Sequence, residues 1–306
     1  MANNVMTVTG PISPGDMGLT LPHEHVMVDF IGADKVGKHR YRPDDVVSTM
    51  LPHIKEAQEQ GVRTFVDCTP MYLGRDVEVL RTISELTGLQ ILTNTGQYKE
   101  PHLPAETFEI EAEALADGWI REFEEGIDGT SIKPGFIKTA VERERLAPMQ
   151  QKVVRAAALT SQATGLTIAT HTGVAIAAME VLDIVEAVGV SPDRWIFVHS
   201  QNEQDTDLHV QVARRGAWTS LDGIGPGRDD EHLVPLLRLL DAGLERQVLL
   251  SHDAGWYRVG EEPGGAKKLF THLLDEFVPL MKRNGVSDET VHTITVTNPS
   301  IAFEVR

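Results

Sequence analysis

Five side chains of the types that bind metal ions stand at or near the ends of short apolar segments. His23 and His25 end the first such segment, and His171, His199 and Asp253 end three later ones. The spacing of His23 and His25 places both imidazoles on the same side of an extended strand, which suits chelation of one metal ion. Such a pair alone is a weak signal. The recurrence of ligand types at matching strand ends favours a metal centre.

Lys138 is a charged residue at the end of the apolar segment 135–138, "GFIK". An unpaired ammonium is costly to bury, and two divalent ions about 3.5–4 Å apart need a bridging anion. Burial and nearby cations favour the neutral amine of a lysine, which can add CO2 to form a carbamate with one oxygen for each metal. We therefore predict a carboxylated, bridging Lys138. The alternative is a lysine that is ion-paired with Asp253 or Glu24, without metal.

Strand-like and helix-like segments alternate eight times along the chain. The expected strands are 19–25, 62–67, 89–94, 135–138, 165–171, 195–200, 216–222 and 247–253, and the expected helices are roughly 44–60, 76–87, 105–125, 149–163, 175–188, 203–214, 231–242 and 266–284. This alternation favours an α/β fold of the (β/α)8 TIM-barrel type, in which all strand ends meet on the face that carries active sites. No linker-like tract divides the chain, so we predict a single domain, 1–306. His252 should point away from Asp253, and we interpret it as structural.

Composition excludes several classes of function. The formal net charge of −17 disfavours nucleic acid and anionic membranes as partners. No apolar run approaches the ~20 residues that span a membrane, and the first residues lack the pattern of a signal peptide. The only cysteine, Cys68, leaves no disulfide within the chain. These features predict a cytoplasmic protein that acts on a small molecule.

Longer motifs make the chain similar to the phosphotriesterase family of the amidohydrolase superfamily, almost from end to end. They are "GPISPGDMGLTLPHEHV", "GVRTFVDCTP", "LGRDVEVLRTISELTGLQILTNTGQY", "EGIDGTSIKPGFIK", "RAAALTSQATGLTIATHTG", "LLSHDAG" and "NPSIAF". The resemblance implies a (β/α)8 barrel with a binuclear zinc-type centre, although cobalt or manganese also suits such sites. By position, His23, His25 and Asp253 match the ligands of the more buried metal, and His171 and His199 match those of the more exposed one. Lys138 matches the carboxylated bridging lysine, and the family also implies a homodimer.

The resemblance implies hydrolysis of organophosphate triesters or of lactones, and two departures bear on the choice. Tyr98 matches a tyrosine of the lactonase branch. Gly223 stands where acyl-homoserine lactonases carry an arginine and phosphotriesterases a histidine, and the segment after Asp253 is shorter than the loop that forms a lipophilic channel in those lactonases. Small polar lactones are therefore favoured. The predicted substrate contacts are Tyr98, Lys99, Arg228, Trp256, Tyr257 and Arg258.

The predicted function is a binuclear-metal hydrolase that opens lactones of small polar, sugar-type or phosphorylated kinds. A metal-bridging hydroxide attacks the carbonyl, Asp253 moves the proton to the leaving oxygen, and phosphotriester hydrolysis is a slow side activity. One alternative keeps the site but makes a phosphotriester or another ester the main substrate. Another is a metal-bearing barrel that binds a ligand without turnover.

Overall fold

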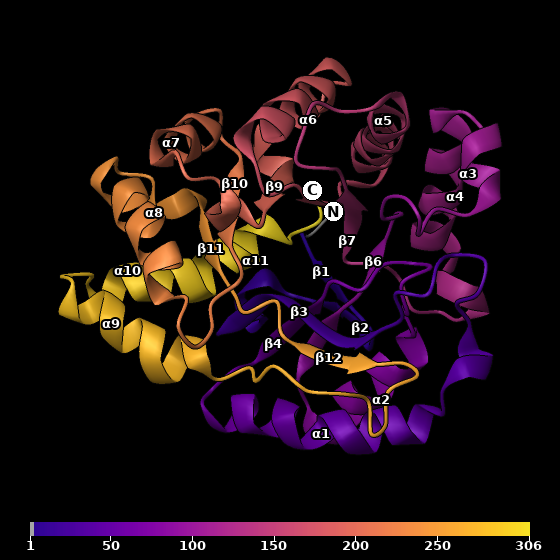
Figure 1. The fold of residues 1–306 in the computed structure, drawn as a ribbon, viewed down its shortest axis with the longest axis horizontal. Coiled ribbons are helices and arrows are strands. Elements are labelled where there is room, and N and C mark those ends of the chain that lie inside the picture. The colour runs from indigo at the N-terminus through magenta and orange to yellow at the C-terminus, as the bar shows by residue number, and fades with distance from the viewer. Residues whose placement is uncertain (1–2) are drawn as a thin grey trace.

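Within residues 3–306, the part of the chain that the computed structural model describes, eight parallel strands form a central ring (Figure 1). In chain order they are β3 (Thr20–Val28), β4 (Thr64–Asp67), β5 (Gln90–Leu92) continued by β6 (Asn94–Thr95), β7 (Phe136–Ala140), β8 (Ile168–His171), β9 (Trp195–Val198), β10 (Trp218–Leu221) and β11 (Val248–Leu250). Pairing runs from β3 to β5 and from β6 to β11, and only Thr93 separates β5 from β6.

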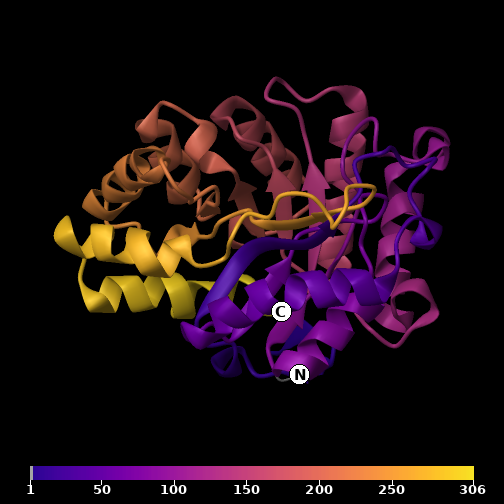
Figure 2. The same cartoon turned by 60° about the horizontal axis from the view of Figure 1, so that its bottom comes forward.

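The ring closes between β11 and β3 through the residues that follow β11. Asp253 N donates to the main-chain oxygen of His23 (3.0 Å), and His25 N donates to that of Ala254 (2.9 Å). A further strand, β12 (Gly255–Arg258), then runs parallel to the second half of β3 (Figure 2). The closure therefore fixes the chain around Asp253 directly against the His23–His25 segment.

Helices cover the outside of the ring, with polar residues outward and apolar residues towards the strands. They are α1 (Pro43–Glu59), α2 (Val77–Thr87), α3 (Ala105–Glu109), α4 (Ala112–Glu125), α5 (Pro148–Thr164), α6 (Ala175–Ala187), α7 (Thr206–Arg214), α8 (Asp229–Asp241), α9 (Val278–Arg283), α10 (Asp288–His292) and α11 (Asn298–Ala302). The local signals are clear in α2. Asp76 caps its first turn by accepting from Glu78 N and Val79 N, and Gly88 ends it with a φ of 75°.

The amino ends of the strands are closed by the two ends of the chain. Phe136 from the ring packs edge-on against Phe303, with ring centroids 5.5 Å apart, and Val5 and Met17 belong to the same buried cluster. The hairpin of β1 (Val5–Thr7) and β2 (Gly10–Ile12) lies at this end, where Val305 N donates to Asn4 O (2.8 Å). The carboxyl end of the ring, on the opposite side, is therefore the end where a functional site can form.

The predicted single-domain (β/α)8 barrel is confirmed, with local corrections. The domain's exact bounds stay a prediction, since residues 1–2 lie outside the described range. The strand expected to end at Lys138 continues to Ala140, because it pairs with β8 as far as His171. The helix expected over 105–125 is interrupted at Ile110–Glu111. The helix expected over 266–284 begins only at a π-helical turn, Leu273–Phe277, because Lys268 forms an antiparallel bridge with Gly255.

The final helical segment, 288–302, and the strand β12 were not predicted. In the part of the chain that the structure describes, no helix combines the length and the apolar character needed to cross a membrane.

Candidate metal centre

Four imidazoles form an arc at the carboxyl end of the ring. Neighbouring ring centroids are 5.4 Å apart for His25 and His23, 5.0 Å for His23 and His199, and 4.5 Å for His199 and His171. These residues come from β3, β8 and the residue after β9. Strands far apart in sequence thus bring the four predicted ligand histidines together.

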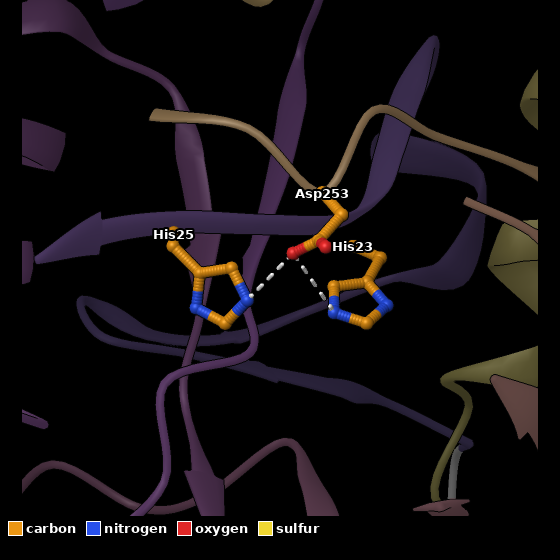
Figure 3. Close-up of side chains that lie close together, drawn as sticks. All are labelled: His23, His25 and Asp253. Atoms are coloured by element: carbon orange, nitrogen blue, oxygen red, sulfur yellow. Dashed lines mark ion pairs between the residues drawn. The ribbon is translucent and has the colours of Figure 1, made fainter. Parts of the chain in front are cut away.

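Asp253 lies near the His25 end of this arc, and its carboxylate faces both His25 and His23 (Figure 3). Its Oδ1 is 3.1 Å from His25 Nε2 and 3.8 Å from His23 Nε2. Two imidazole nitrogens that face one carboxylate oxygen form a compact donor set of the kind that holds a divalent ion.

The Nδ1 atoms of three of these imidazoles are engaged by acceptors behind the site. His23 and His199 hydrogen-bond Asp222 through Nδ1, at 2.9 and 2.6 Å, and His25 Nδ1 lies 2.7 Å from Thr69 Oγ1. Partners of this kind fix the tautomer of a ligand histidine and orient its ring. The Nε2 atoms of His23, His25 and His199 are therefore the ones available to bind a cation.

Lys138 is buried in the middle of β7, with 2% of its surface exposed. Among residues 3–306, its ammonium nitrogen has no hydrogen-bond partner and forms no ion pair. The alternative of a lysine paired with Asp253 or Glu24 is thus wrong for this structure. A buried amine without a partner is what a lysine that is modified to a metal-bridging carbamate would leave, so the residues present fit a pair of divalent ions.

The Glu24 carboxylate binds the segment 251–254 and not Lys138. Its fully buried carboxylate accepts from Ser251 Oγ (2.8 Å), His252 Nδ1 (2.7 Å) and Ala254 N (2.8 Å). These bonds hold the segment 251–254 against β3 and thereby place Asp253. His252 faces this network and its Nε2 accepts from Leu273 N (2.9 Å), as its predicted structural role requires.

Sequence reasoning missed Asp222, although it follows β10 at the same carboxyl end as the histidines. Its carboxylate is fully buried and also accepts from Ser220 Oγ (2.8 Å) and His199 N (3.1 Å). The strand-end rule that singled out His171 would also have found it. A carboxylate beneath two ligand-type imidazoles adds negative charge under the centre.

Burial and electrostatics at the centre oppose protonation of His23 and His171. Burial, with the nearby Lys138 charge, lowers the pKa of His23 to about 4 despite the raising effect of Asp222. Burial together with His199 holds the pKa of His171 well below its usual range. Burial alone would raise the pKa of Asp253, but the hydrogen bond from His25 and the nearby imidazoles lower it well below its ordinary value. These shifts favour neutral His23 and His171 imidazoles and an ionised Asp253 carboxylate, the forms that bind metals.

Backbone strain coincides with the centre. His199, Asp253 and Trp256 have φ values of 60°, 51° and 69°. This left-handed region is uncommon for residues other than glycine and persists where the surrounding structure imposes it. Such strain at two predicted ligands and an adjacent aromatic residue supports a functional constraint on their positions.

The predicted substrate contacts fall into two groups. Tyr98 is close to the centre, with its hydroxyl 3.0 Å from His171 Nδ1, and Trp256 packs edge-on against His25 with centroids 5.7 Å apart. Tyr257 lies on the other face of β12, where it is 8% exposed and packs in the core. This placement counts against Tyr257 as a substrate contact. The three predicted cations form ion pairs: Lys99 with Glu142 (2.8 Å), Arg228 with Glu231 (2.8 Å) and Arg258 with Glu261 (3.9 Å).

A cavity of about 480 Å³ lies between the loop 223–228 and the segment 267–276, and the residues that line it include Gly223, His252 and Ala254, the neighbours of Asp222 and Asp253 in the chain, but none of the predicted ligands. Gly223 lines it, and a Cβ at this position would lie 2.7 Å from Gln201 Nε2 and 3.1 Å from Arg228 Nη1. A side chain at position 223 would therefore shift the flexible end of Gln201, which contacts Asp222, or that of Arg228 at the rim.

A parallel α/β barrel with imidazoles, a carboxylate and a buried lysine at the carboxyl ends of its strands defines a metal-dependent hydrolase. Among such enzymes, the chain belongs to the phosphotriesterase family, whose model matches residues 3–303. The predicted family and the prediction of an enzyme are both confirmed. They argue against the alternative prediction, a metal-bearing barrel that binds a ligand without turnover.

Relatives and solved structures cover nearly the whole chain. An aryldialkylphosphatase of Saccharolobus solfataricus is 30% identical over 306 residues, covering 95% of this chain and 96% of the relative. A phospho-furanose lactonase of Mycoplasmopsis synoviae is 28% identical, covering 98% and 92%. A mutant organophosphorus hydrolase from Deinococcus radiodurans superposes with a TM-score of 0.89 at 31% identity, covering 98% and 97%. The names of these proteins span both lactones and phosphoesters.

Proposed function

We propose that this chain is a binuclear-metal hydrolase that opens lactones, with small polar, sugar-type or phosphorylated lactones favoured. The observation that carries the choice is the Tyr98 hydroxyl, 3.0 Å from His171 Nδ1. Burial, with Asp253 and Glu142 nearby, raises the pKa of Tyr98, so the phenol keeps its proton. Opening a lactone expels an alkoxide, which needs a hydrogen-bond donor or a proton far more than an aryl oxide does. Tyr98 is such a donor.

In this proposal the six ligand-type residues divide between two metals. His23, His25 and Asp253 would hold one ion, His171 and His199 the other, and Lys138, carboxylated by CO2, would bridge them. Two divalent ions, expected to be zinc with cobalt or manganese as alternatives, would supply Lewis acidity and an activated water. The ionised Asp253 can accept a proton from the attacking water and pass it to the leaving oxygen.

The rim supports a small substrate. After Asp253 the chain lies along β3 as β12 and then returns through the bridge between Gly255 and Lys268. We infer that this short return replaces the long loop that would wall an acyl chain, and Leu269 is the exposed large apolar side chain that it adds to the cavity. Each buried CH2 contributes about 0.8 kcal/mol, so an enzyme without such a wall should show little preference for longer chains.

A phosphotriesterase is the second candidate, and the relatives favour it. The aryldialkylphosphatase and the organophosphorus hydrolase are both named for phosphoesters and are at least 30% identical to this chain. In this alternative, the same centre activates a water for attack at phosphorus, and lactone opening is the side activity.

Measuring kcat/KM separates the two proposals. The panel contains a hydroxylated five-membered lactone, acyl-homoserine lactones of increasing chain length and an aryl dialkyl phosphate, at one pH and with one metal. We expect the small lactone to be the best substrate and the triester a slow one. A steep rise with chain length, or a triester as the best substrate, would overturn the choice of substrate while leaving the metal centre in place.

Two further properties belong to the proposal. A cytoplasmic location is supported by the single cysteine, Cys68, which is buried and leaves no disulfide within the chain. A homodimer is expected from the family, and sedimentation of the purified protein would test it.

A further inference from the structure

Lys268 is a cation at the rim that has no carboxylate partner within residues 3–306, and its neighbour Lys267, which lines the same cavity, has none either. Lys99, Arg228 and Arg258 are each ion-paired, whereas Lys268 forms no ion pair with any residue from 3 to 306. Its side chain is exposed to solvent and lines the cavity of about 480 Å³. A positive charge at a cavity wall that is not neutralised by the protein can be neutralised by a ligand.

The Lys268 ammonium is held in place without being neutralised. Its Nζ donates to the main-chain oxygen of Asp253 (3.2 Å) and lies 4.8 Å from the centre of the Trp256 ring. A carbonyl and an aromatic face both attract an ammonium but leave its full charge. The ammonium therefore stands at the residue whose carboxylate faces His23 and His25.

The backbone of Lys268 is also fixed. Gly255 N donates to Lys268 O (3.0 Å), and Lys268 N donates to Gly255 O (3.3 Å). This antiparallel bridge ties Lys268 to the residue two positions after Asp253. Little loop entropy therefore remains to be lost when a ligand binds, which favours affinity.

A second donor is close by. The indole N–H of Trp256 is buried and lacks a hydrogen-bond partner in the described part of the chain. Because the Lys268 ammonium lies over this ring, the two donors are neighbours. Asp275 and Glu276 also line the cavity, so an anion is favoured only at the end where Lys268 stands.

We propose that Lys268 binds an anionic group of the substrate, a carboxylate or a phosphate, and thereby determines specificity. This inference rests on the proposed lactone hydrolysis and names the class of lactone. Because Lys268 contacts the main chain of Asp253, the anionic group and the carbonyl under attack must be separated by only a short spacer. The favoured substrate is thus a small lactone with an acidic substituent close to its ring.

The test compares three five-membered lactones that carry a carboxymethyl, a phosphooxymethyl or a neutral hydroxymethyl group. In the metal-loaded protein, Lys268→Met should lower kcat/KM for the better anionic lactone by about tenfold to a hundredfold, the range for a hydrogen bond to a charged group, mainly through KM. The neutral lactone should be affected by less than about threefold, and Lys268→Arg should retain most of the selectivity. The two anionic lactones show whether a carboxylate or a phosphate is preferred.

Lys267→Met is the matched control, because it removes a charge that lines the same cavity but has no contact with Asp253. The Lys267 ammonium donates to the main-chain oxygens of Pro263 (3.2 Å) and Gly265 (2.5 Å) and lies over Tyr257, on the other face of β12. Selectivity for the anionic lactone should survive this change. Equal effects of Lys267→Met and Lys268→Met would show bulk electrostatics and would overturn the assignment.

A binding measurement separates this inference from the proposed function. Calorimetry compares carboxylated and neutral five-membered lactams, which are hydrolysed far more slowly than lactones, on the unsubstituted protein and on Lys268→Met. Tighter binding of the carboxylated lactam that is lost in the variant supports Lys268, even if no lactone is turned over. No preference for the carboxylated lactam, or a preference that Lys268→Met leaves intact, overturns the inference whatever the enzyme hydrolyses.

Discussion

Asp222→Asn isolates the role of the carboxylate beneath the centre. The two oxygens of Asp222 accept from His199 Nδ1 (2.6 Å) and His23 Nδ1 (2.9 Å). One imidazole belongs to each of the two proposed metal positions. Asparagine has nearly the same shape but only one accepting oxygen, so it can accept from one imidazole and must turn an N–H2 group towards the other.

The structure sets the size of the effect. Losing one of the two imidazole hydrogen bonds to this buried charged group should lower the free energy of unfolding of the metal-free protein by about 1.5 to 3 kcal/mol. The freed imidazole is no longer held in the tautomer that presents Nε2 to a metal. Loss of such a partner typically weakens metal binding by about tenfold to a hundredfold, so one of the two ions should be lost first.

The assay is metal competition against a chromophoric chelator, with urea unfolding of the metal-free protein in parallel. Ser220→Ala is the control, since it removes another hydrogen bond to Asp222 (2.8 Å) without touching an imidazole. It should lower stability but leave metal affinity within a few-fold. Unchanged metal affinity in Asp222→Asn, or the same affinity loss in Ser220→Ala, would refute the reasoning.

Three further predictions concern the predicted ligands. Lys138→Ala should lose at least one divalent ion and most activity, and the intact mass of the gently handled protein should show one added CO2 that the variant lacks; a free amine in the fully metal-loaded protein would contradict the carbamate. Asp253→Asn should lower kcat by about 10²–10⁴ while metal content, measured by elemental analysis, changes much less; a near-normal rate would assign the proton transfer to another group. The metal-free protein should lose stability as pH falls from 6.5 towards 4. The reason is that the pKa of His23 is lowered from 6.5 to about 4, so the unfolded chain binds a proton that the folded protein does not. Urea unfolding should show a loss of about 1.4 kcal/mol per pH unit from this group, reduced in His23→Gln, and an unchanged slope in that variant would exclude His23 as the cause.

Much of the barrel fold could be predicted from the sequence, because the signals for strands and helix ends are local. Apolar runs that are buried on both faces predicted the parallel strands, and Gly88 and Gly165 stand directly after α2 and α5, where a left-handed glycine ends a helix. Once the barrel is inferred, ligand types at strand ends must converge, and the four histidines do form one arc. This part of the site follows from one-dimensional spacing and the geometry of the fold.

What the sequence could not supply depends on contacts between distant segments. Asp222 and Glu24 are ordinary acidic residues in the sequence, and only the closed ring shows that one lies beneath two imidazoles while the other holds the segment 251–254. The helix expected at 266–284 begins late because Lys268 pairs with the main chain of Gly255, although the local sequence pattern is helical.

The residues at the rim of the site also show what the sequence predicted and what only the tertiary structure decided. The sequence identified Tyr257 beside Trp256 as a pair of rim residues, but the two-residue period of β12 sends one side chain to the core and the other towards His25. It gave equal weight to Lys99, Arg228 and Arg258, which the folded chain neutralises with carboxylates. Lys268 stands out only in three dimensions, because whether a charge is free depends on which residues the tertiary structure places around it.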